Sequence, residues 1–147
     1  MITEAEQSVL DIDWFFTDGH NIGFVASGGG KLPEAISKSN EDIEEMALYF
    51  RGLPITTDPI VNPKLNEVMS GRAVNDRYLL DFIDMAKKGL YAFDKSILNN
   101  FFDGNYHLVA RPVRPMKLNE LPTKIAHRLI RTRDKRKIAD HLSIDAL

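Results

Sequence analysis

A short aromatic run near the N-terminus, Trp14-Phe15-Phe16, constrains the fold more than any other part of the sequence. It is followed by Asp18-Gly19-His20-Asn21, whose residue types tolerate the positive φ angles that tight connections require. The apolar segment Ile22–Ala26 comes next. Because aromatic residues are enriched in strands, the pattern predicts a β-hairpin over residues 12–27.

The adjacent pair Trp14 and Phe15 adds a second constraint to this hairpin. Neighbouring side chains of a strand point to opposite faces of the sheet. One of the two must therefore face away from the main core. It either packs beneath a helix or lies on the surface, where it would be a candidate anchor for a partner.

The remaining elements follow from caps and periodicity. Ser39 or Asn40 precedes an acidic turn and an apolar stripe, which predicts a helix ending at Gly52. Asn75 caps a second predicted helix that ends at Lys88. The other expected elements are a helical turn at 65–71, strands at 90–93 and 106–113, and helix from Pro122 onward, with Ile125, Leu129, Ile130, Ile138 and Leu142 as its apolar positions.

These elements predict the fold class. The strands come as hairpin-like pairs and not in β-α-β alternation, which favours an α+β fold. We expect an antiparallel sheet of about four or more strands, packed with three to four helices. Prolines at 54, 59 and 63 mark an irregular connection, but residues 1–52 alone could hardly bury a core. We therefore expect residues 1–147 to form a single domain.

Composition excludes several kinds of chemistry. The chain has no cysteine, which rules out disulfides, thiolate metal sites and a cysteine nucleophile. Its histidines stand singly, without metal-ligand spacing, so neither a metal nor another cofactor is expected. The N-terminus is acidic and polar, unlike a secretory signal, and no apolar window is long enough to span a membrane. We expect a cytoplasmic protein that does not bind membranes.

The glycine run Gly28-Gly29-Gly30 permits two interpretations. Glycine-rich loops can bind phosphate through their backbone N–H groups. However, Val25 and Leu32 break the Walker A pattern, and Pro33 breaks the dinucleotide fingerprint. A structural or interaction loop is therefore favoured. The alternative is a small-ligand or phosphate-binding protein, or an enzyme, that uses this loop with Asp18, His20 or His107 as catalytic groups.

Charge is unevenly divided along the chain. Residues 1–60 carry three basic and eleven acidic side chains, whereas residues 61–147 carry sixteen basic and ten acidic ones. The segment Glu41–Glu45 is acidic, and the stretch from Lys124 to Lys137 is basic. No nucleic-acid-binding motif accompanies the basic stretch. We expect it to form a solvated helical face or to contact the acidic half, and we do not expect it to bind nucleic acid.

Several segments resemble a known kind of protein. Asp13-Trp14-Phe15-Phe16-x-Asp18-Gly19, with the glycine-rich segment that follows it as far as Pro33, resembles the opening of small bacterial proteins that are often immunity proteins of polymorphic or contact-dependent toxin systems. Residues 89–94 and 106–115 are similar as well. The resemblance implies a cytoplasmic, non-enzymatic protein that blocks a cognate toxin by occlusion. It transfers no functional residue.

Together these observations predict a protein-binding module of the immunity type, with a protein partner. The uneven charge would help to steer a charged partner toward it. The predicted contact residues are Trp14, Phe15, Gly28, Gly29, Gly30, Glu41, Glu44 and Glu45.

Overall fold

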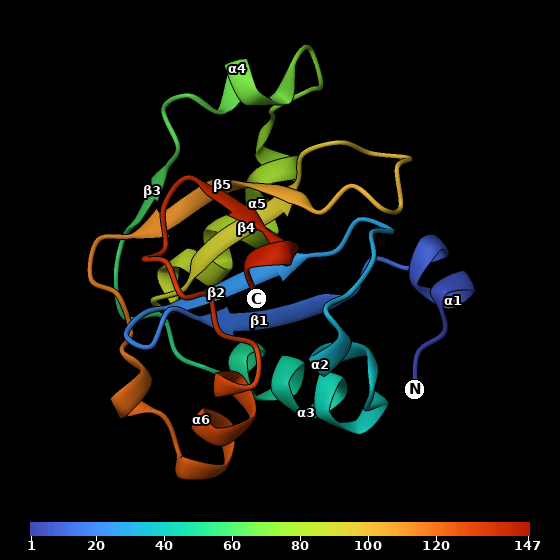
Figure 1. Cartoon of the computed structure of the whole chain (residues 1–147). Helices are drawn as coiled ribbons and strands as arrows, with labels where there is room; N and C mark the ends of the chain where they lie inside the picture. Colours follow the sequence, from blue (N-terminus) through green and yellow to red (C-terminus); the bar gives the residue numbers. More distant parts are fainter.

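A single mixed β-sheet forms the centre of the computed structural model, which describes all residues from Met1 to Leu147 (Figure 1). The strand order is β1-β2-β4-β5-β3, and β6 pairs with β5 beyond the end of β3. The strands are β1 (Asp13–Thr17), β2 (Ile22–Ala26), β3 (Pro59–Val61), β4 (Tyr91–Lys95), β5 (Asn105–Pro112) and β6 (His141–Ser143).

The predicted hairpin and the α+β class are confirmed. β1 and β2 pair antiparallel from Asp13 opposite Ala26 to Thr17 opposite Ile22. Four of the five strand pairs are antiparallel, as expected, but β2 and β4 run parallel. The reason is the connection between them. Parallel neighbours need a long crossover, and residues 27–90 supply one that contains four helices and β3.

The two helices predicted from their caps are also confirmed. Ser39 Oγ accepts the Asp42 N–H at 3.2 Å, and Asn75 Oδ1 accepts the Tyr78 N–H at 2.9 Å. Two further short helices, α1 and α2, bring the number of α-helices above the three to four expected. The α-helices are α1 (Glu4–Val9), α2 (Glu34–Ser37), α3 (Asn40–Arg51), α4 (Leu65–Met69), α5 (Asp76–Lys87) and α6 (Thr123–Ile130), and short 3-10 helices lie at Leu118–Glu120 and Ile144–Ala146.

The prediction of continuous helix after Pro122 is wrong beyond Ile130. The chain leaves α6 and runs along the outer edge of β1, where the Thr132 carbonyl accepts the Thr17 N–H at 3.1 Å. The Asp134 N–H returns to the Thr17 carbonyl at 2.9 Å, and the chain then forms β6. These hydrogen bonds link residues far apart in sequence, so local periodicity could not reveal them.

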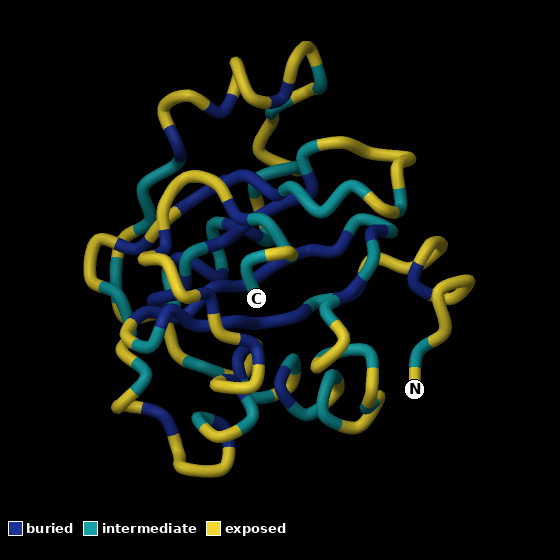
Figure 2. The backbone as a smooth tube through the Cα atoms, viewed as in Figure 1, coloured by how far each residue is buried: buried dark blue, intermediate teal, exposed yellow.

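Both faces of the sheet are buried. On one face Phe15 and Phe24 pack against α3, α4, α5 and α6. On the other face Trp14 and Phe16 pack beneath Leu32 and the C-terminal segment. All five residues of β2 are buried, and the buried backbone of the central strands is visible in Figure 2. Trp14 and Phe15 therefore point into two different cores, and neither reaches the surface.

Replacing Phe15 with alanine should destabilise the protein by about 3–5 kcal/mol, the usual effect of removing a large buried aromatic side chain. The Phe15 ring stacks on Phe50 with centroids 4.4 Å apart. Urea denaturation measures the change. Leu48→Ala is the matched control, because this α3 side chain is 77% exposed and its loss should change stability by no more than about 0.5 kcal/mol. Equal losses in the two variants would contradict the packing described above.

Candidate functional site

The glycine loop lies at the end of β2, and its backbone donors are already used. The Gly28 N–H donates to Asp11 Oδ1 at 2.9 Å, the Gly29 N–H to the Leu10 carbonyl at 3.1 Å, and the Gly30 N–H to the Ser27 carbonyl at 2.8 Å. A phosphate site of this kind needs free N–H groups that point at the ligand. The loop as folded therefore presents none of these three N–H groups to an anion.

Close packing explains the glycines instead. Gly29 has a φ of +74°, and a Cβ there would lie 2.8 Å from the Ser8 carbonyl oxygen. A Cβ on Gly30 would lie 2.9 Å from the Tyr106 hydroxyl and 3.0 Å from Lys95 Nζ. The loop thus fits between the end of α1 and the side chains of β4 and β5, and larger residues would separate these elements.

Lys95 lies under this loop and was not identified from the sequence. Its side chain is 1% exposed and forms no ion pair. Nζ donates to the Asp103 carbonyl and lies 5.7 Å from the centre of the Tyr106 ring. Burial lowers the pKa of Lys95 below its usual value. One buried side chain therefore connects β4 to the loop that follows it, directly beneath the glycine loop.

Apolar side chains gather on the surface around this point. The Gly29 hydrogen bond brings the end of α1 to the glycine loop, and the Lys31 N–H donates to the Phe101 carbonyl at 3.0 Å. The loop between β4 and β5 is thereby held against the same place, at one end of the sheet (Figure 1). We call the exposed apolar side chains here, together with Gly28–Gly30, the glycine-loop surface; they are Val9, Leu10, Ile97, Leu98 and Phe102.

Acidic groups border the glycine-loop surface. Glu6, Asp11 and Asp103 form no ion pair. Two cations lie nearby. Lys31 pairs with Glu4 at 3.4 Å and lies 5.5 Å from the centre of the Phe102 ring, and the half-buried Arg72 donates to the carbonyls of Lys95 and Ser96. The border is thus negatively charged around an apolar centre.

The other predicted contact residues lie elsewhere. Trp14 and Phe15 are buried, so the prediction that they contact a partner is wrong; the sheet is covered on both faces. Glu41 and Glu44 are exposed on α3. Glu45 instead pairs with Arg128 and with Lys124, the latter at 3.0 Å, and Arg128 lowers its pKa.

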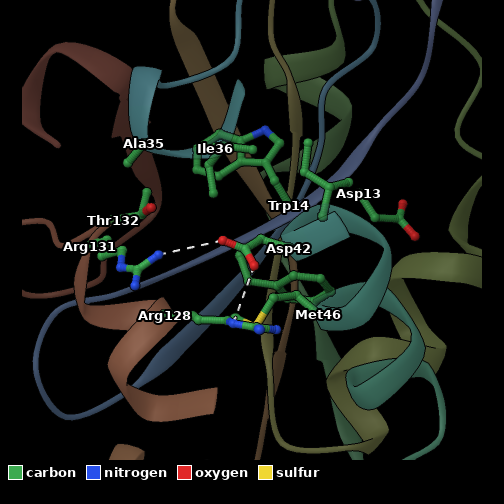
Figure 3. Close-up of a pocket in the computed structure, with 11 residues that line it drawn as sticks. Asp13, Trp14, Ala35, Ile36, Asp42, Met46, Arg128, Arg131 and Thr132 are labelled. Atoms are coloured by element: carbon green, nitrogen blue, oxygen red, sulfur yellow. Dashed lines mark hydrogen bonds and ion pairs between the residues drawn. The ribbon is translucent and has the colours of Figure 1, made fainter. Parts of the chain in front are cut away.

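The expected contact between the acidic and basic halves is confirmed at this seam between α3 and α6. Asp42 lies between Arg128 and Arg131, at 3.3 and 3.5 Å (Figure 3). Behind these pairs is a cavity of about 30 Å³ beside β1, whose wall includes Ile43 and Thr132. Small-molecule sites usually measure about 300–1,000 Å³, so this cavity is far too small for such a ligand.

The three candidate catalytic groups do not converge. Asp18 accepts three backbone N–H groups, from His20 at 2.9 Å, Asn21 at 2.7 Å and Ile138 at 3.0 Å. Burial alone would raise the pKa of Asp18, but these donors lower it. His20 lies in the β1–β2 turn, whereas His107 pairs with Asp94 in register at the opposite end of the sheet. Asp18 thus ties the turn to the C-terminal segment.

His107 belongs to a separate polar cluster on the helix-covered face. Ser96 Oγ lies 3.1 Å from His107 Nδ1, and the Tyr78 hydroxyl donates to Asp94 Oδ2 at 2.6 Å. Arg72 donates to the carbonyls of Lys95 and Ser96. Burial raises the pKa of Asp94 and lowers that of His107 to about 4. No strong sequence signal identified this cluster, because its members come from α5, β4, β5 and the loops beside them and meet only in the folded chain.

No three histidine or carboxylate side chains are arranged to hold a metal ion. None of the helices combines the length and the apolar composition needed to cross a bilayer. Comparison of the chain with protein-family models, with curated proteins and with solved structures finds no match.

The lowered pKa of His107 predicts a pH dependence of stability. Its pKa is about 4 when folded and about 6.5 when unfolded, so the unfolded chain binds more protons between these values. Above pH 6.5 His107 is neutral in both states and does not lower the free energy of unfolding. As the pH falls from 6.5 to 4, the unfolded chain gains the proton first and the free energy of unfolding decreases. Between pH 7 and pH 4, wild type should lose roughly 3 kcal/mol more unfolding free energy than His107→Gln.

Urea denaturation across this pH range measures the difference. Asp94, whose raised pKa acts in the opposite direction, is present in both proteins and drops out of the comparison. His127→Gln, a change at an exposed position on α6, is the control and should follow the wild-type profile. Parallel profiles for wild type and His107→Gln would show that His107 does not cause the effect.

Proposed function

We propose that the chain is a non-enzymatic protein-binding module and that the glycine-loop surface contacts its partner. The observation that carries the proposal is the gathering of exposed apolar side chains from three segments at one place. Val9 is 80% exposed and Phe102 is 71% exposed. Contiguous apolar patches bordered by polar groups are typical of protein interaction sites. An exposed aromatic ring in such a patch is a natural anchor.

The charges around the glycine-loop surface indicate what kind of partner would bind it. The carboxylates of Glu6, Asp11 and Asp103 border the patch without ion pairs, so the partner surface carries basic side chains around an apolar centre. Two exposed basic residues of the chain itself, Arg133 and Lys137, lie near the β1–β2 turn at the opposite end of the sheet. This separation of charge orients an approaching basic partner toward the glycine-loop surface.

The buried connection beneath the patch favours binding without rearrangement. Lys95 fixes the β4–β5 loop through the Asp103 carbonyl, and the glycine loop fixes the end of α1. A surface held in one conformation loses less conformational entropy on binding. The resemblance to immunity proteins supports a specific form of this function: the chain occludes a cognate toxin in the cytoplasm.

Phe102→Ser should weaken partner binding at least tenfold, because the ring offers the largest exposed apolar area on the glycine-loop surface. The tagged chain captures the partner from lysate of the native host, mass spectrometry identifies it, and calorimetry with the purified partner measures affinity. Leu48→Ser is the matched control, since Leu48 is equally exposed on α3 but distant in the fold, and it should bind like wild type. Both variants should keep the wild-type urea midpoint.

Two outcomes separate the parts of this proposal. If Phe102→Ser binds as tightly as wild type, the glycine-loop surface is not the contact. If the captured protein arrests growth when expressed alone and wild type relieves the arrest while Phe102→Ser does not, the toxin-neutralising function is established. A partner that binds through Phe102 but harms no cell would remove the immunity function and leave the binding module.

A further inference from the structure

The outer edge of β1 has an unusual gap in its hydrogen bonding. In an antiparallel pair, successive residues of a strand direct their N–H and C=O groups alternately toward and away from the partner strand. The Asp18 N–H donates to the Asn21 carbonyl and the Ser27 N–H to the Ile12 carbonyl, at 3.4 and 3.0 Å. Residues with even numbers therefore face β2, and Asp13, Phe15 and Thr17 face outward.

The outward groups of Thr17 find partners, but those of Phe15 do not. Thr17 forms one step of a parallel ladder with residues 132–134. The next step would join the Phe15 N–H to the carbonyl of residue 130, and the Thr132 N–H to the Phe15 carbonyl. The Thr132 N–H is already used within α6, where it donates to the Leu129 carbonyl at 3.0 Å. The last turn of the helix thus prevents the ladder from continuing.

Phe15 is 2% exposed, so its unpaired backbone groups are shielded from bulk solvent. A buried N–H or C=O without a partner is destabilising, and nearly all such groups in native proteins are paired with protein or ordered water. The cavity of about 30 Å³ lies on this side of β1, between the strand, α3 and the start of the 131–138 segment. Figure 3 shows Asp42 and Arg128 at its wall.

We propose that one or two ordered water molecules occupy this cavity and complete the hydrogen bonding of Phe15. A cavity needs about 10–15 Å³ per water and two to four polar partners, and both conditions are met. Water accepts from the Phe15 N–H and donates to its carbonyl, and the polar wall offers further partners in Asp42, Arg128 and Thr132. The water takes the place of the missing ladder step.

The ion pairs of Asp42 with Arg128 and Arg131 lie over the same cavity. They border the site on its outer side, and a water held there by several hydrogen bonds exchanges more slowly than bulk water. Slow exchange makes the site visible in solution, because a long-lived water gives a magnetisation transfer to a neighbouring amide that bulk water does not.

The test uses the whole chain in two measurements. A high-resolution crystal structure should show water within about 3 Å of the Phe15 nitrogen or carbonyl oxygen. In solution, the ¹⁵N-labelled chain should give a water-to-amide NOE at Phe15 and none at Thr17, which is the internal control because its N–H donates to Thr132. A dry cavity would overturn the proposal. An opened last turn of α6 that places the carbonyl of residue 130 on Phe15 would do the same.

Discussion

Strand β2 is buried along its whole length, and the rest of the architecture follows from the need to cover both sides of it. Phe24 requires an apolar layer on one face and Val25 requires one on the other. The long crossover from β2 to β4 supplies helices for the first face. The C-terminal segment returns across the sheet and covers the second with Ile138 and Leu142. A sheet with one solvent-exposed face would need only one of these layers.

Buried polar groups hold the layers on the two faces of the sheet in place. The Asp18 carboxylate joins the first hairpin to residue 138, and the Lys95 ammonium joins β4 to the following loop. Each group is taken out of water and each finds backbone partners, which is the condition for burying it at tolerable cost. These contacts also explain why conspicuous polar residues of the turn are structural: their hydrogen-bonding capacity is used within the fold.

The glycine-loop surface lies where the layers on the two faces of the sheet end. Beyond Ala26 and Lys95 the chain leaves the sheet in loops, and α1 and the β4–β5 loop meet there over the glycines (Figure 1). Their apolar side chains have no further layer to pack against. The same glycines that looked like a phosphate loop instead allow three segments to approach closely. The proposed binding surface is therefore a product of tertiary packing and not of a linear motif.

The sequence by itself determined the first hairpin, the helices α3 and α5 and the α+β class, and it offered the contact between oppositely charged halves as one of two alternatives. These features depend on nearby signals or on overall charge: alternating aromatics, an Asn or Ser cap, an acidic turn. It also directed attention to Gly28–Gly30, although for contact residues it pointed equally to Trp14 and Phe15, which are buried.

Only the tertiary structure decided the parallel pairing of β2 with β4, the end of α6, the acceptors of the glycine N–H groups and the burial of Lys95. Each of these depends on partners distant in sequence, as when Ile138 donates to Asp18. The sequence does not indicate which distant acceptor a hydrogen-bond donor will bind. That choice is made when the whole chain folds and every buried polar group must find a partner.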